Sequence, residues 1–322
     1  MPIGNSRIFP MGPCEGERAS LVAGDGKVKI ARDVSRMKKG RISTIVLVVI
    51  LLAGLCLLLY PTVSDYWNRL HQSKAIADYD EAVSQLDDAR CDELWQEAVE
   101  YNETLLSNPD RFKMTDEERA RYEHLLDVLG NGIIGSVDIP SIGCSLPIYH
   151  GTDMAVLQIA VGHIEGSSLP VGGPGTHCVL SGHRGLPSAR LFTDIDKLEP
   201  GDRFSLRVLN KTLTYEVDKI SIVLPYELDN LQIEEGADYC TLVTCTPYGV
   251  NDHRLLVRGH RVEGSASDDA ARVVSDAIQI DPMIVAAAVG TCMLVILLVA
   301  LVASAGKRES KGRRERGGNC GK

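Results

Sequence analysis

Two uncharged apolar runs constrain this chain more than any other feature. The first is Ile42–Tyr60, with 19 residues, and the second is Met283–Ala305, with 23 residues. At about 1.5 Å per helical residue, each run is long enough to cross, or nearly cross, the hydrocarbon core of a bilayer. The segment between them, residues 61–282, carries 18 basic and 37 acidic side chains. We therefore expect a membrane protein with an acidic middle segment.

Basic residues outside both runs predict the topology. Four Lys or Arg side chains lie in residues 36–41, and five lie in residues 307–314. Because such flanks remain on the cytoplasmic side, both termini are predicted to be cytoplasmic and residues 61–282 extracellular. A cleaved signal peptide is the alternative for the first run, but the run is long for one and no clear cleavage site follows it.

Composition and charge narrow the class of protein further. A formal net charge of −9 argues against a general nucleic-acid binder, and 44% hydrophobic with 24% charged residues excludes wholesale disorder and a many-span transporter. Residues 1–41 and 306–322 are expected to be basic cytoplasmic tails, with Met37 as an alternative start, and residues 265–282 a linker.

The extracellular segment divides into a helical part and a β-rich part. Residues 61–130 are predicted to be a helical extension, because residues 63–106 carry apolar side chains at helical spacing. Asn108-Pro109-Asp110 breaks this pattern, and Thr115 with Glu118 predicts a capping box that starts a second helix.

From residue 131 to residue 264, short β-rich runs alternate with Gly/Pro turns. Eight such runs predict an antiparallel-rich barrel or sandwich. The predicted strands are residues 133–139, 146–149, 177–180, 204–209, 213–217, 220–224, 239–243 and 255–257.

The best candidate for chemistry is a cysteine at the end of one of these strands. Five cysteines lie in residues 61–282, and an odd number leaves at least one free thiol. Cys245 lies beside a turn, where a nucleophile is rigid yet accessible, and a nearby cation would hold its thiolate. His183 lies in a similar strand-end turn. Arg254 begins the returning strand, but it shares a face with Arg258, so spacing alone leaves both open.

A zinc site is a weaker alternative. His177, Cys178 and Cys240 are potential ligands, but the paired-ligand spacing of structural zinc sites is absent. We expect no metal and no cofactor.

Longer stretches around these residues resemble a known family. Residues 241–251 (TLVTCTPYGVN) and 254–259 (RLLVRG) are similar to the signature of class C, pilus-assembling sortases of Gram-positive bacteria. The similarity continues upstream in residues 180–190 (LSGHRGLPSAR), 162–173 and 147–151. The resemblance implies a mainly β protein: a closed eight-stranded catalytic barrel over residues 131–264, with a helical N-terminal extension and two transmembrane helices.

The resemblance also implies the site and the reaction. Cys245 would be the nucleophile, His183 the general acid/base, and Arg254 the group that binds substrate and the developing oxyanion. Such a membrane-anchored transpeptidase cleaves the Thr–Gly bond of an LPxTG-type sorting signal and transfers the pilin to a lysine amine of another pilin. Thr244 and Tyr248, close to the cysteine, are candidates for the substrate groove. The implied partners are donor and acceptor pilins and the lipid bilayer of the plasma membrane.

Two finer features also follow from the resemblance. Many pilus sortases carry a lid with an Asp-Pro-aromatic motif, and the corresponding residues here make Asp110 and Phe112 the candidate lid residues, although no Asp precedes Pro109. The family also places the strands before His183 and Cys245 side by side and parallel. Cys178 and Cys240 would then lie at one level, so a disulfide between them is a hypothesis.

Two other classes of protein stay open. A cysteine protease would use the same nucleophile and release its product to water. A non-enzymatic adhesin or pilin would carry a sorting motif just before its C-terminal apolar run, and no LPxTG sequence precedes Met283 here.

Overall fold

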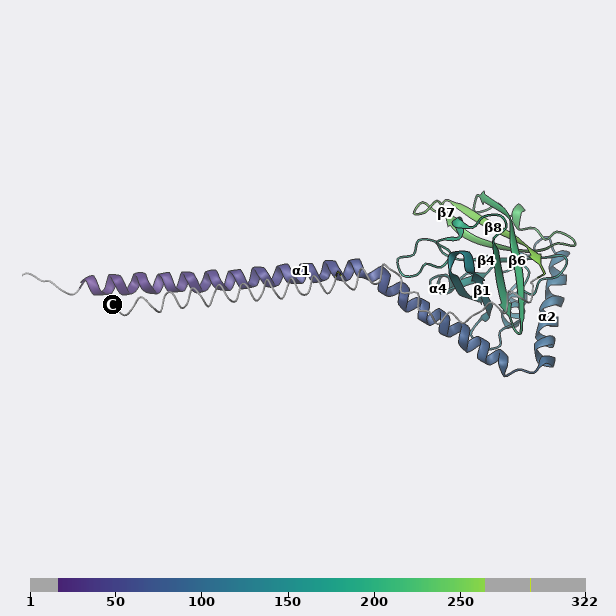
Figure 1. Ribbon diagram of the computed structural model, residues 1–322, viewed down its shortest axis with the longest axis horizontal. Helices are drawn as coiled ribbons and strands as arrows, with labels where there is room; N and C mark the ends of the chain where they lie inside the picture. Colours follow the sequence, from purple (N-terminus) through teal and green to yellow (C-terminus); the bar gives the residue numbers. More distant parts are fainter. Residues whose placement is uncertain (1–16, 264–289, 291–322) are drawn as a thin grey trace, which may run out of the picture. The chain divides into compact units, whose positions relative to one another are not determined.

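The computed structural model describes residues 17–263 and residue 290. The described chain falls into two units that divide between Leu58 and Leu59, and every described strand belongs to the second unit (Figure 1). The predicted linker 265–282, the C-terminal tail and, apart from residue 290, the second apolar run lie outside the described residues.

The first apolar run lies in a single long helix, α1 (Glu17–Ser84). Within the described residues, one helical segment, Val48–Ser84, is long and apolar enough to cross a membrane. Leu57 and Leu58 are 76% and 72% exposed, which is costly in water and favourable in lipid. These features agree with a first membrane span at this place.

The C-terminal part of α1 packs against the barrel. Tyr79 is buried, and its hydroxyl donates to the Ile134 carbonyl at 3.2 Å and accepts the Leu209 N–H at 3.0 Å. Asp80 forms an ion pair with Arg207 at 2.7 Å. These contacts fix the helix to the first and fifth strands of the barrel and to the turn that follows the fifth strand.

The predicted helix over residues 63–106 is interrupted at residues 85–87. A second helix, α2 (Asp88–Leu106), begins there because the Asp87 carboxylate caps it by accepting the Arg90 N–H at 2.8 Å. Figure 1 shows α2 along one side of the barrel. The capping box at Thr115 and Glu118 is confirmed, and it starts α3 (Asp116–His124).

Eight strands form a closed barrel in the order β1-β2-β3-β4-β7-β8-β6-β5, which confirms the expected fold. Neighbours are antiparallel except for the β2–β3 and β4–β7 pairs, which are parallel. The strands are β1 (Ile133–Ile139), β2 (Cys144–His150), β3 (Val161–His163), β4 (Thr176–Ser181), β5 (Arg203–Val208), β6 (Lys211–Val223), β7 (Asp238–Thr246) and β8 (His253–Val262). Short helical turns connect them: η1 (Pro140–Ile142), α4 (Met154–Leu157), η2 (Ile195–Lys197) and η3 (Asp229–Leu231).

The predicted number of strands is right, although two of the individual assignments are wrong. The two predicted strands 213–217 and 220–224 are one strand, β6, with a register irregularity between Val217 and Lys219. The polar Asp218-Lys219 pair at this irregularity interrupts the alternation from which strands are predicted. The short β3 was missed, because a strand of three residues with Gly162 at its centre is too short to show an alternation of apolar and polar side chains.

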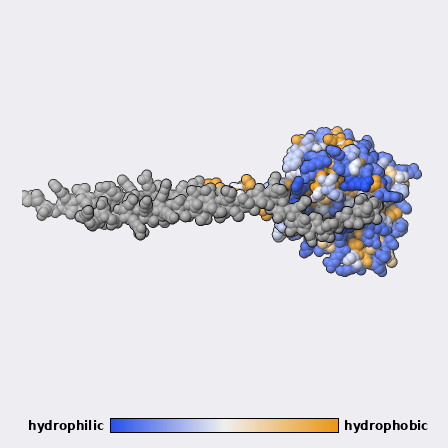
Figure 2. All heavy atoms as spheres, in the orientation of Figure 1, coloured by the Kyte–Doolittle hydropathy of each residue, from blue (hydrophilic) through white to orange (hydrophobic). Residues whose placement is uncertain are grey.

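Side chains from alternating strand positions fill the barrel. Leu180, Leu242 and Val257 are fully buried inside it, and Phe204 stacks on Tyr215 with ring centroids 5.6 Å apart. A second, smaller cluster is separate from this core and consists of Val179, Val223, Leu231, Val243 and Leu256. We call it the outer cluster, because its strand residues alternate with those of the core. The visible face of the barrel unit is mainly hydrophilic (Figure 2).

Candidate active site

Two of the three predicted catalytic residues lie opposite one another on neighbouring strands. Cys245 of β7 and Arg254 of β8 are register partners in an antiparallel pair. Directly opposed residues have Cβ atoms about 4.5–5.5 Å apart and point to the same face. Both side chains are partly exposed, so this pair is accessible at the end of the barrel where β7 turns into β8.

His183 reaches the same level by way of the parallel β4–β7 pair. Ser181 is opposite Val243, and the Gly182 N–H donates to the Val243 carbonyl at 3.0 Å. His183 is two residues beyond Ser181, as Cys245 is two beyond Val243. Continuing the register therefore brings His183 level with Cys245. Burial lowers the pKa of His183 below its ordinary value, so the ring is mainly neutral at physiological pH.

The loop after His183 is held against the end of β7. Arg184 forms an ion pair with Asp196 and donates to the Thr246 hydroxyl at 3.4 Å. Gly185 has a positive φ of 75°, and a Cβ there would collide with the ring of Tyr248. This close approach of backbone and ring explains the glycine and fixes the position of the loop.

The two groove candidates have different environments. Tyr248 is 63% exposed and lies against Gly185, so its ring is available to a bound peptide. Thr244 is 1% exposed, and its hydroxyl donates to the Gly182 carbonyl at 2.8 Å. Thr244 therefore holds the backbone just before His183 from inside the barrel. It does not line an open groove.

Charge partners distinguish the two arginines that the sequence left open. Arg254 donates through Nη1 to the carbonyls of Asn251 and His253, at 3.1 and 3.0 Å, and forms no ion pair among residues 17–263. Arg258 instead pairs with both oxygens of Asp218, through Nε at 3.1 Å and Nη2 at 2.7 Å. Of the two arginines, Arg254 is thus the register partner of Cys245, and within residues 17–263 its charge has no carboxylate partner.

The candidate lid segment contacts the barrel through a residue that sequence reasoning missed. Arg111 is 5% exposed and donates to the carbonyls of Gly166 at 3.3 Å and Leu231 at 2.9 Å. Its guanidinium lies 4.4 Å from the ring centroid of the partly buried Phe112. Asp110, by contrast, is exposed and pairs with Lys113 at 2.8 Å. No pattern in the sequence marks Arg111 as a buried residue.

The other strand-paired cysteines lie inside the barrel. Cys178 and Cys240 are register partners at 2% and 0% exposure, and both are free thiols, so the disulfide hypothesis is wrong for this structure. Burial raises the pKa of Cys240 well above its ordinary value. His177 contacts Gln232 and Thr241 instead of these sulfurs, which disfavours the zinc alternative.

Comparison with known proteins agrees with this geometry. A model of the Sortase domain matches residues 137–262. The solved structure of sortase C1 from Streptococcus agalactiae is 50% identical, with a TM-score of 0.58, over 60% of this chain and 100% of that chain. The chain belongs to the sortase family of cysteine transpeptidases.

Two further sortases are similar to this chain. Sortase C from Clostridium perfringens, solved with the C-terminal cell wall sorting motif, is 43% identical over 60% of this chain and 100% of that chain, with a TM-score of 0.53. Sortase D from Bacillus subtilis is 33% identical over 131 residues, which are 40% of this chain and 63% of that relative. The Streptococcus agalactiae and Clostridium perfringens structures are both sortases of the C type, in agreement with the resemblance in the sequence.

Proposed function

We propose that this sortase joins pilin subunits covalently at the outer face of the plasma membrane. The observation that carries the proposal is the Cys245–Arg254 register pair, with His183 two residues beyond the end of the neighbouring β4, whose Ser181 is opposite Val243. Support for the substrate class comes from the Clostridium perfringens relative, which was solved with a sorting motif. The substrate would be an LPxTG-type signal near the C-terminus of a secreted pilin.

The first half-reaction would form a thioester. Neutral His183 accepts the thiol proton of Cys245 as the sulfur attacks the threonine carbonyl of the Thr–Gly bond. Negative charge develops on that oxygen, where the guanidinium of Arg254 stabilises it. When the carbon–nitrogen bond breaks, His183 returns the proton to the leaving glycine amine. The pilin is then bound to Cys245 through its threonine.

The second half-reaction would transfer the pilin. A lysine amine of a second pilin attacks the thioester carbonyl, and His183 accepts a proton from this amine. Collapse of the intermediate expels the Cys245 sulfur, which regains its proton from His183. The product is an isopeptide bond, and no cofactor or metal takes part in the proposed steps.

The membrane would hold the enzyme where its substrates emerge from export. The exposed apolar face of α1 supports the first span at residues 42–60. We propose the second span, residues 283–305, from its sequence and its basic flank. Two spans would keep both tails in the cytoplasm and the barrel, residues 131–264, outside.

The experiment that tests this function uses the full chain in detergent with an LPxTG peptide and a lysine-containing acceptor peptide. We expect intact mass to reveal an acyl adduct, which digestion locates on Cys245, and the acceptor to resolve it into a transfer product. Cleavage without transfer would favour a cysteine protease instead. Absence of an adduct, also in the lid variant described next, would favour a non-catalytic barrel.

We also propose that residues 107–113 act as a lid held by Arg111. The replacement Arg111→Met keeps a long, unbranched side chain but removes the hydrogen bonds to the carbonyls of Gly166 and Leu231. Because two buried hydrogen bonds of about 1 kcal/mol each are lost, about 2 kcal/mol in all, we expect Cys245 to react about 30-fold faster with a small thiol reagent. The rate is measured by mass spectrometry of the Cys245 peptide.

The control for this prediction is Lys113→Ala. It removes only the exposed pair with Asp110, which contributes little in water, so the rate should stay within a factor of two. An Arg111→Met rate equal to that of the wild type would exclude this lid contact. Phe112→Ala then tests separately whether the ring itself covers the thiol.

A further inference from the structure

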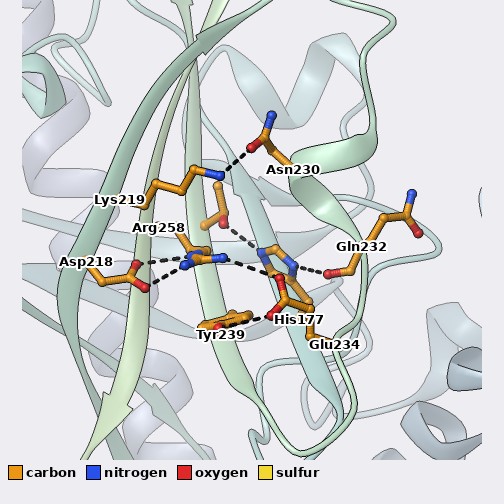
Figure 3. Close-up of polar contacts among 9 residues, drawn as sticks. His177, Asp218, Lys219, Asn230, Gln232, Glu234, Tyr239 and Arg258 are labelled. Atoms are coloured by element: carbon orange, nitrogen blue, oxygen red, sulfur yellow. Dashed lines mark hydrogen bonds and ion pairs between the residues drawn. The ribbon is translucent and has the colours of Figure 1, made fainter.

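A polar cluster on the outer face of the barrel contacts the segment that connects β6 to β7. Figure 3 shows the side chains of Asn230 and Glu234, and the backbone carbonyl of Gln232, directed towards side chains on the strands. Their partners are Lys219, His177 and Arg258, from three different strands. We call residues 230–234 the connecting segment.

His177 is the most deeply buried member of the cluster, at 1% exposure. Its Nδ1 is 2.8 Å from the Gln232 carbonyl oxygen, and its Nε2 is 2.7 Å from the Thr241 hydroxyl. Because a carbonyl only accepts, Nδ1 carries the hydrogen and Nε2 accepts from Thr241. Burial lowers the pKa of His177 to about 4, and the nearby positive charges of Arg258 and Arg111 act in the same direction. The hydrogen bond to the Gln232 carbonyl and the negative charge of Glu234 act in the opposite direction. The neutral ring is therefore a fixed link between the strands and the connecting segment.

Arg258 forms the second link. Its bidentate pair with Asp218 fixes the guanidinium on β6, and its Nη1 lies 3.7 Å from Glu234. The guanidinium lies 4.0 Å from the ring centroid of Tyr239, whose hydroxyl donates to Glu234 at 3.3 Å. Planar stacking and two-oxygen pairing together restrict the orientation of an arginine more than a single ion pair does.

Next to the first link, the connecting segment enters the outer cluster through Leu231. Leu231 is 6% exposed and packs in the cluster that contains Val243 and Leu256, which are register partners. Val243 and Leu256 lie two residues from Cys245 and Arg254 and share their face. Leu231 therefore packs at a level of the strands about 7 Å from the reactive pair. The two links lie farther along the strands, because Thr241 and Arg258 are each four residues, or about 14 Å, from Cys245 and Arg254.

We propose that His177 and Arg258 are positioning residues for peptide recognition, which hold the connecting segment as a fixed wall beside Cys245. The inference rests on the proposed function, because it concerns binding of the same peptide. Neither residue touches the reacting atoms. Replacement of His177 or Arg258 should leave the chemistry at Cys245 intact. It should weaken binding, because the peptide must then also order the connecting segment, which costs free energy in each binding event.

The test compares His177→Leu with His177→Asn. Leucine fills a similar volume but leaves the Gln232 carbonyl and the Thr241 hydroxyl without their partner. We expect the KM for the sorting peptide to rise about tenfold, with kcat within threefold of the wild type. Asparagine places an N–H near the position of Nδ1, so it should recover most of the lost affinity. Arg258→Ala should act in the same direction.

Controls separate positioning from general stability. Tyr79→Phe removes buried hydrogen bonds at a part of the barrel far from β7, so it should lower the melting temperature without raising KM. Arg90→Ala removes only an exposed ion pair with Glu93 on α2 and should leave both parameters unchanged. An unchanged KM in His177→Leu, or a fall in kcat alone, would overturn the proposal.

Amide hydrogen exchange distinguishes failure of this inference from failure of the proposed function. In His177→Leu we expect the amides of residues 230–234 to exchange at least about tenfold faster. If the wild type does not process the peptide, the proposed function fails. Amide hydrogen exchange of residues 230–234 then remains the test of whether His177 holds the connecting segment. Unchanged exchange in this segment would overturn the inference whatever the activity.

Discussion

Replacement of Cys245 by alanine is expected to abolish acyl transfer. Loss of the nucleophile leaves no atom to form the thioester, and removal of a nucleophile typically lowers kcat by more than about 10⁴-fold. The adduct with the sorting peptide should disappear from the intact-mass spectrum. Because the side chain lies partly exposed at a strand end, the variant should retain the melting temperature of the wild type within a few degrees.

The matched control for this prediction is Cys240→Ala, five residues earlier on the same strand. Cys240 is fully buried on the inner face, so this variant should lose stability through a small cavity but keep its activity when it is folded. An adduct that persists in Cys245→Ala, or that disappears in folded Cys240→Ala, would contradict the assignment of Cys245 as the nucleophile.

Replacement of Arg254 by alanine is expected to lower kcat/KM for the sorting peptide by about 10²- to 10³-fold. The variant removes the positive charge beside the thiol, where charge develops on the threonine carbonyl oxygen. Arg254→Lys should recover only part of the loss, because a lysine keeps the charge without the planar set of donors. Steady-state kinetics with a fluorescence-quenched LPxTG peptide measures both variants.

Two comparisons make the Arg254 prediction specific. Arg203→Ala, at an exposed ion pair with Glu216 on the distant β5–β6 pair, should leave kcat/KM within twofold. Arg258→Ala should act mainly through KM, whereas Arg254→Ala should lower kcat. Equal effects of the alanine variants at 254 and 258 would contradict the distinction that their charge partners suggest.

Much of the organisation could be predicted from the sequence, because it depends on local patterns. The apolar run before residue 60, the break after Leu106 and the capping box at Thr115 are each encoded within a few residues. Strand β1 was predicted with its observed bounds, since its turns and its β-rich composition are local as well. The family resemblance added barrel closure, which no local pattern determines.

Errors in the prediction arose where tertiary contacts compete with local preference. Strand β6 continues through Asp218 and Lys219 because β8 pairs with it on both sides of the irregularity. The short β3 exists because β2 and β4 provide partners for its backbone. Neither partner is visible in the residues of the strand itself.

The sequence by itself determined which residue types could carry out the chemistry: a strand-end thiol, a histidine in a Gly-bounded turn and two arginines on one face. Only the tertiary structure decided that Arg254 lies opposite Cys245 and, among residues 17–263, has no carboxylate partner, while Arg258 pairs with Asp218. It also decided that Arg111 and His177 are buried. The reason is physical: register and ion pairing join residues from strands distant in sequence, and no local spacing specifies them.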